Sequence, residues 1–262
     1  MKEELRLYWI AFRNVILSLN IIKLRSLFRP GKLVRLTQAE LFVHQSLAGR
    51  RKLEQKNVYD VIAPGRPAES IRFEIPNKWM DAETSYTKDM ITLALSCKLI
   101  RPAAVFEIGT LDGYTALLFA LNTPDDTRIY TLDLLPGKAP VLPITEMDRK
   151  HVISRNQIRE LAFRGKSEEI KIIPLFGDSH RFDYSAYRGK IDLFFIDGAH
   201  SYPCVKSDTE NALKCMKRGG LLIWHDYGRV GVNGVSKYLH ELAEEMPIFS
   251  VPGSSLAFSV IP

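Results

Sequence analysis

The segment Glu107-Ile108-Gly109-Thr110-Leu111-Asp112-Gly113 decides the fold, because it joins a short apolar stretch to an apolar helical pattern. Residues 103–108, apolar apart from Glu107, have the length and character of a short buried strand. Residues 114–122 follow with the pattern of a helix. The glycines at 109 and 113 permit a tight turn and a close approach of the backbone to a ligand. This order of strand, loop and helix predicts an α/β sheet that binds a ligand beyond its strand ends.

The same alternation of strands and helices continues on both sides of this segment. Further strands are expected at 128–133, 170–176, 191–196, 221–224, 248–251 and 256–261, and helices at 84–100, 155–164, 205–216 and 235–246. The last two strands flank the turn Pro252-Gly253-Ser254-Ser255 and predict a hairpin. Short apolar strands separated by helices are typical of a doubly wound, mostly parallel sheet. We therefore expect an α/β fold with seven strands.

The N-terminal part of the chain differs from this domain in charge. Residues 1–66 hold 13 lysines and arginines against 5 acidic residues, whereas the remaining residues hold 23 against 25. Residues 1–75 are expected to form a basic helical extension, and residues 76–262 the α/β domain. The uncharged run at 14–22 is too short to span a bilayer. The extension could pack on its own domain, form a homodimer, or contact a membrane surface.

Charge and cysteine content argue against several classes of protein. The basic surplus is confined to the extension, which disfavours a nucleic-acid partner, since phosphate neutralisation dominates such binding. The three cysteines show no Cys-x-x-Cys spacing, so neither a disulfide framework nor a zinc-thiolate site is expected. No signal-peptide cleavage pattern follows the N-terminal apolar stretch. A cytoplasmic protein is the resulting expectation.

Acidic residues follow the first three strands of the sheet and suggest the cofactor. Glu107 and Asp112 flank the glycine loop, where they would repel a pyrophosphate but favour a cation. S-adenosylmethionine carries an ammonium and a sulfonium group and no phosphate, so the loop suits it better than a dinucleotide. Asp133 could accept hydrogen bonds from the ribose hydroxyls, and Asp178 could reach the adenine amino group. Tight turns and helix caps would explain each residue singly.

The expected cofactor contacts come from the loops after four strands. They are Glu107, Gly109, Thr110, Asp112, Gly113, Tyr114, Asp133, Leu134, Gly177, Asp178, Ser179 and Asp197.

The fourth and fifth strands end in residues that suit a metal ion and proton transfer. Adjacent parallel strands would bring Asp197 close to His225 and Asp226, a set that could hold Mg²⁺ or another divalent metal. His200 could then act as the catalytic base for an acceptor hydroxyl. In the alternative interpretation, the two aspartates cap helices and bind the cofactor, while the histidines are merely hydrogen-bonded.

Residues 84–227 resemble the class I S-adenosylmethionine-dependent methyltransferases, and within them the methyltransferase type 24 group of small-molecule and sugar O-methyltransferases. The resemblance rests on Glu107-Ile108-Gly109 with Gly113, Asp133, Asp178-Ser179, Ile196-Asp197-Gly198-Ala199-His200-Ser201-Tyr202, Lys217-Arg218-Gly219-Gly220 and His225-Asp226-Tyr227. It implies a Rossmann-like methyltransferase fold and S-adenosyl-L-methionine as cofactor.

In related macrolide-sugar O-methyltransferases and cephalosporin-hydroxylase-like proteins, an Asp-Asp-Gly-Ser-His segment supplies a metal ligand and the general base. The resemblance assigns these roles to Asp197 and His200. The chain departs from that pattern twice, with Ile196 in place of the first Asp and His225-Asp226 in place of Glu-Asp.

The expected activity is methyl transfer to a hydroxyl group of a small molecule, such as a sugar or natural product, with a divalent metal assisting. Two other functions stay open. One is N-methylation of an amine or peptide, and the other is a non-catalytic, methyltransferase-like docking protein.

Overall fold

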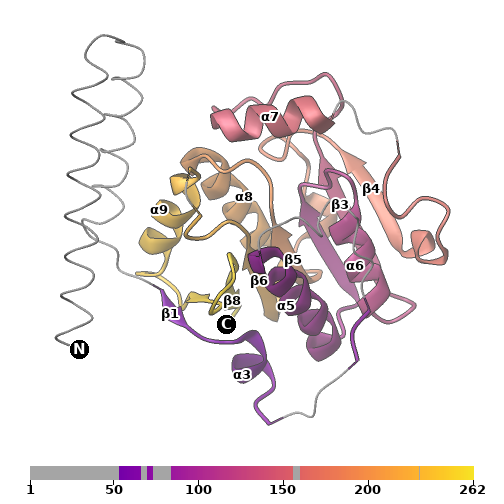
Figure 1. Cartoon of the computed structure of the whole chain (residues 1–262), viewed down its shortest axis with the longest axis vertical. Helices are drawn as coiled ribbons and strands as arrows, with labels where there is room; N and C mark the ends of the chain where they lie inside the picture. Colours follow the sequence, from indigo (N-terminus) through magenta and orange to yellow (C-terminus); the bar gives the residue numbers. More distant parts are fainter. Residues whose placement is uncertain (1–52, 66–69, 73–83, 156–159, 230) are drawn as a thin grey trace. The chain divides into compact units, whose positions relative to one another are not determined.

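The computed structural model of the 262-residue chain describes residues 53–65, 70–72, 84–155, 160–229 and 231–262. These residues build an eight-stranded sheet in the order β1-β7-β8-β6-β5-β2-β3-β4 (Figure 1). The strands are β1 (Glu54–Gln55), β2 (Ala104–Ile108), β3 (Arg128–Asp133), β4 (Ile172–Phe176), β5 (Ile191–Ile196), β6 (Met216–Trp224), β7 (Phe249–Ser250) and β8 (Ala257–Val260). The α-helices are α3 (Val58–Ile62), α5 (Thr84–Ile100), α6 (Tyr114–Asn122), α7 (Glu146–Arg155), α8 (Tyr202–Cys215) and α9 (Asn233–Leu242).

The strand pairing confirms the predicted doubly wound sheet. Strands β4, β3, β2, β5 and β6 pair in parallel, and β8 runs antiparallel to both β6 and β7. All seven predicted strands are present, and β7 with β8 forms the predicted hairpin. The eighth strand, β1, was not predicted. It is two residues long and pairs in parallel with β7, and so short a strand has no hydrophobic period to detect.

Alternating side chains of the central strands pack into two separate hydrophobic cores, one on each face of the sheet. Leu193 and Phe195 of β5 pack with α5 and α6 on one face, while Phe194 and Ile196 pack with α8 and α9 on the other. Figure 1 shows these two pairs of helices on opposite sides of the sheet. A strand buried on both faces reads as a continuous apolar run. The positions of the central strands could therefore be predicted from the sequence.

One predicted helix lies elsewhere. The sequence suggested a helix at 155–164, but α7 spans Glu146–Arg155 and turns follow in the described residues 160–166. A reciprocal cap starts α7: the Thr145 amide donates to Asp148 Oδ2 at 2.7 Å, and the Asp148 amide donates to Thr145 Oγ1 at 3.1 Å. This is capping-box geometry with aspartate at the third helical position, and it fixes the helix start nine residues earlier than predicted.

The compact unit that contains the sheet runs from Leu53 to Pro262 and so begins earlier than the boundary near residue 75 that the sequence suggested. The Leu53 amide donates to the Tyr227 hydroxyl at 3.1 Å, and Val58 of α3 is buried in the same core as α5. The sequence predicts a basic helical extension over residues 1–75. Residues 1–52 of that extension lie outside the residues that the structure describes. Within the described ranges, no helix reaches the length and apolar character that crossing a bilayer requires.

Candidate active site

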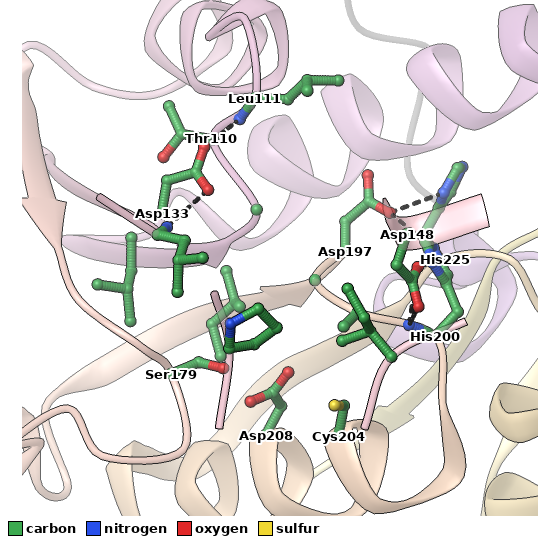
Figure 2. Close-up of a pocket in the computed structure, with 18 of the residues that line it drawn as sticks. Thr110, Leu111, Asp133, Asp148, Ser179, Asp197, His200, Cys204, Asp208 and His225 are labelled. Atoms are coloured by element: carbon green, nitrogen blue, oxygen red, sulfur yellow. Dashed lines mark hydrogen bonds and ion pairs between the residues drawn. The ribbon is translucent and has the colours of Figure 1, made fainter. Parts of the chain in front are cut away.

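The carboxyl ends of the parallel strands enclose a cavity of about 450 Å³. Its walls come from the loops after β2, β3, β4, β5 and β6, with side chains added by α5, α7 and α8 (Figure 2). Pro140, Leu142 and Ile144, between β3 and α7, contribute apolar surface. A cavity at this edge is the place where a doubly wound sheet binds its ligand.

Gly109 and Gly113 are required by packing within the protein. At residue 109, where φ is +101°, a Cβ would lie 2.1 Å from the carbonyl oxygen of Asp197. At residue 113, where φ is +81°, a Cβ would lie 2.8 Å from the ring of Phe163. Sequence reasoning attributed Gly109 to a close ligand. The structure shows that the loop after β5 is the neighbour that excludes a side chain there, although Gly109 also lines the cavity.

Glu107 lies behind the loop, fully buried, and is not among the residues that line the cavity. The Thr131 hydroxyl donates to its Oε2 at 2.5 Å, and the hydroxyls of Thr131 and Thr110 lie 2.6 Å apart. Within the described residues, Oε1 has no hydrogen-bond partner. Burial raises the pKa of Glu107 to about 8. Glu107 is therefore mostly uncharged at neutral pH and presents no carboxylate to the cavity, whereas Asp112, the other acid of this loop, does line it.

Asp133, at the end of β3, lines the cavity where the sequence predicts a ribose contact. Its Oδ2 accepts a hydrogen bond from the Leu111 amide at 2.9 Å, and its Oδ1 accepts one from the Leu134 amide at 2.7 Å. Leu111 has a φ of +47°, which is uncommon for a residue with a side chain. Asp133 thus holds the loop after β2 in a strained conformation at the edge of the cavity.

Asp178 follows β4 and is already bonded to the backbone. Its Oδ2 accepts a hydrogen bond from the Val141 amide at 2.6 Å, and its Oδ1 accepts one from the His180 amide at 3.0 Å. Asp178 therefore joins the segment between β3 and α7 to the loop after β4. A second acidic residue, Asp208 of α8, lines the same cavity.

The structure places most, but not all, of the predicted cofactor residues in the cavity wall. The lining residues are Gly109, Thr110, Asp112, Asp133, Leu134, Gly177, Asp178, Ser179 and Asp197. Glu107, Gly113 and Tyr114 do not line the cavity. The predicted base His200 and the predicted metal ligands Asp197, His225 and Asp226 all do.

The imidazole of His200 lies between two carboxylates. Its Nδ1 is 2.5 Å from Asp148 Oδ1, and its Nε2 is 2.6 Å from Asp226 Oδ2. Burial alone would lower the pKa of His200, but its contacts with these two carboxylates and the nearby Asp197 outweigh burial and raise the pKa to about 10. In this arrangement His200 is an imidazolium at neutral pH. It must release a proton before it can serve as a base.

His225 is held in the same way between Asp197 and Asp89. Its Nδ1 lies 3.0 Å from Asp197 Oδ1, and its Nε2 lies 3.2 Å from Asp89 Oδ2. Asp89, from α5, is 1% exposed and accepts further hydrogen bonds from the Ser254 hydroxyl and from the amide and hydroxyl of Ser255. The turn between β7 and β8 therefore helps to fix the orientation of His225.

The donor set fits a divalent cation. Asp197, His225 and Asp226 each offer one ligand atom, and these atoms lie within 4.8 Å of one another. Two carboxylates and an imidazole suit a transition metal and are also compatible with Mg²⁺. The register Ile196↔Trp224 between β5 and β6 explains the proximity, because the two strands end side by side. Asp226 has a φ of +60° and also contacts Arg229 Nη1 at 2.8 Å.

Sequence reasoning missed Asp89, Asp148 and Asp208, which lie on α5, α7 and α8. The spacing of Thr145 and Asp148 signals a helix cap, and the same carboxylate reaches His200. Asp89 and Asp208 are acidic residues on the buried faces of their helices. An acidic residue on a helix face that is expected to be buried is the one signal that could have marked them.

Comparison with known proteins identifies the domain type. Residues 106–227 match a family model described as a methyltransferase domain, of the type 24 group. The match runs from β2 to the loop after β6 and includes every predicted cofactor, metal and catalytic residue. It confirms the resemblance to this group. A search of curated proteins gave no match.

Several solved structures are similar to this chain. The O-methyltransferase TomG from Streptomyces achromogenes, in complex with SAM, is 18% identical, with a TM-score of 0.46 over 70% of this chain and 83% of its own. The Podospora anserina methyltransferase PaMTH1, bound to SAH, is 16% identical, with a TM-score of 0.48 over 70% and 87%. A putative caffeoyl-CoA O-methyltransferase from Staphylococcus aureus is 19% identical, with a TM-score of 0.48 over 72% and 93%. Similarity this low transfers neither an acceptor nor a mechanism.

Glu107→Gln tests the buried acid. Because the pKa of Glu107 is raised to about 8 in the folded protein, the folded state retains a proton that the unfolded state loses above its ordinary pKa of 4.5. The contribution of Glu107 to stability is full below pH 4.5 and is lost as the pH rises towards 8, by at most about 1.4 kcal/mol per pH unit. Glutamine removes this dependence.

The measurement is the free energy of unfolding by urea at pH 6 and at pH 8, for both proteins. The difference between the two pH values should be smaller in Glu107→Gln than in the wild type. An equal difference would show that Glu107 is ionised in the folded protein.

Proposed function

Residues 106–227 of this chain are a methyltransferase domain, and on that premise we propose that the chain moves a methyl group from S-adenosylmethionine to a hydroxyl of a small molecule. The observation that carries the proposal is the imidazole of His200, fixed between Asp148 and Asp226 in the cavity wall. A hydroxyl acceptor must lose a proton during methyl transfer, so it needs such a group nearby. The cavity volume, about 450 Å³, is in the range typical of small-molecule sites.

The acidic lining supports S-adenosylmethionine as the methyl donor. Asp112, Asp133 and Asp197 border the cavity at the ends of β2, β3 and β5. A cationic amino acid and its sulfonium would be attracted to these carboxylates, whereas a pyrophosphate would be repelled. Asp133 lies at the end of the second of these strands, the position from which an acidic side chain can accept hydrogen bonds from ribose hydroxyls.

The transfer itself is an in-line displacement at the sulfonium methyl. The acceptor oxygen forms a bond to the methyl carbon while the bond from carbon to sulfur breaks, and the hydroxyl proton leaves to a base. His200 is the proposed base, and Asp148 fixes its ring through Nδ1. Since both flanking carboxylates stabilise the imidazolium, His200 must first lose its own proton to water, and the neutral ring then accepts the proton of the substrate hydroxyl.

We also propose that Asp197, His225 and Asp226 hold a divalent cation. Asp89 would accept the Nε2 hydrogen of His225 and so present Nδ1 to the cation, which is how carboxylates commonly orient metal-binding histidines. A bound cation would lower the pKa of the acceptor hydroxyl.

The cofactor proposal predicts selective stabilisation by S-adenosylhomocysteine. A thermal unfolding assay should show a rise in melting temperature with this product, because a ligand that binds only the folded state stabilises it by mass action. NAD, which carries a pyrophosphate, should give no rise. Equal responses to the two compounds, or no response to either, would contradict the proposal.

His200→Ala tests the base. Turnover, measured as methyl incorporation into a hydroxyl acceptor found by screening, should fall by at least about 100-fold. Binding of S-adenosylhomocysteine should persist. His240→Ala, which removes a histidine outside the cavity lining, is the matched control and should keep its turnover. Methylation of the hydroxyl acceptor that survives in His200→Ala would contradict the assignment of His200 as the base.

The metal proposal has a readout that does not depend on activity. Millimolar Mn²⁺ or Mg²⁺ should raise the melting temperature of the wild type, and EDTA should reverse the rise. Asp197→Asn removes one charged ligand and should abolish it. An unchanged melting temperature with every divalent cation, together with a rate insensitive to EDTA, would refute metal assistance.

A further inference from the structure

Two aspartates line the side of the cavity near Ser179, and they differ in what they bind. Asp178 uses both carboxylate oxygens to accept backbone amides, from Val141 and His180. Asp208 projects from α8, and among the described residues no group meets hydrogen-bond geometry with either of its oxygens, although the Ser179 hydroxyl is close enough to lower its pKa. It is 1% exposed and still belongs to the cavity wall (Figure 2).

The neighbours of Asp208 make space for its carboxylate but shield it from water. A Cβ at residue 198 would lie 3.1 Å from Asp208 Oδ2, so the glycine there makes space for the acid. Cys204, one turn earlier on α8, and Pro140 and Leu134 line the same cavity. A carboxyl group in so apolar a setting is costly unless a partner satisfies it. A ligand in the cavity is the partner that the geometry leaves available.

Building on the proposed function, we propose that Asp208, rather than Asp178, hydrogen-bonds the amino edge of the cofactor's purine ring. The adenine amino group donates hydrogen bonds, and the adjacent ring nitrogen accepts one. A carboxylate can accept from the amino group, and a protonated carboxyl group can also donate to the ring nitrogen. Asp178, whose oxygens are bound to the backbone, then has the separate task of holding the loop.

The electrostatic setting agrees with this role. Burial raises the pKa of Asp208 to about 7, the Ser179 hydroxyl partly offsets burial, and the charge of Asp178 adds to the rise. Tyr184 and Cys204 are the other titratable groups that interact with it. Near neutral pH a large fraction of Asp208 is therefore a neutral acid, which offers the purine one donor and one acceptor.

The test compares two ligands by isothermal titration calorimetry. The first is S-adenosylhomocysteine, and the second is its 6-deamino analogue, in which hydrogen replaces the amino group. The wild type should bind the analogue at least about 10-fold more weakly, because a buried acceptor loses its donor. Asp208→Ala should bind both ligands with similar affinity, and Asp208→Asn, which retains an acceptor and a donor, should keep the preference.

Asp178→Asn is the matched comparison, since it alters the neighbouring acid in the same way. It should keep the ratio of the two affinities, whatever it does to their absolute values. A wild type that binds both ligands equally, or a preference lost in Asp178→Asn but kept in Asp208→Ala, would overturn the assignment. If Asp208→Ala does not fold, the wild-type ratio still decides, and a wild type that binds neither ligand would overturn the proposed function as well.

Discussion

The contact between the backbone at Gly109 and the carbonyl oxygen of Asp197 is the constraint on which the site depends. It allows the loops after β2 and β5 to touch, with no side chain between them. The Asp197 amide also donates to the Ile108 carbonyl at 2.9 Å, which extends the pairing of the two strands to their ends. The proposed cofactor residues on one loop and the proposed proton-transfer residues on the other are therefore held at a fixed separation. Any side chain at residue 109 would have to push the two loops apart.

The second organising feature is a set of buried carboxylates and imidazoles that pair with one another. Asp148, Asp226, Asp197 and Asp89 surround the imidazoles of His200 and His225, and each ring contacts carboxylates through both nitrogens. Breaking one member of such a network leaves its partners buried and uncompensated, which costs more than the pair contributes when intact. The contacts fix the side chains of this network in the ligand-free protein, and the proposed proton transfer would benefit from that preorganisation.

The fold was largely predictable because its signals are local. The strands that pair in the centre of the sheet are continuous apolar runs, and each ends at a polar residue that can be read directly from the chain. Asp133, Asp197 and Asp226 were found in this way, and the parallel pairing brought the last two together. What could not be predicted comes from elsewhere in the chain. Asp89 meets His225 across 136 residues, and Asp148 meets His200 across 52, and no local pattern encodes either contact.

The placement of β8 has a consequence for how the protein emerges from the ribosome. In the sheet, β8 lies between β6 and β7, although it follows β7 in the chain. During synthesis, β7 cannot join the sheet until residues 257–260 have been made, and β1 must wait with it. The turn at Ser254 and Ser255, which secures Asp89, is completed at the same late stage. The nascent chain can thus carry a nearly finished sheet while His225 still lacks the fixed orientation that the mature site gives it.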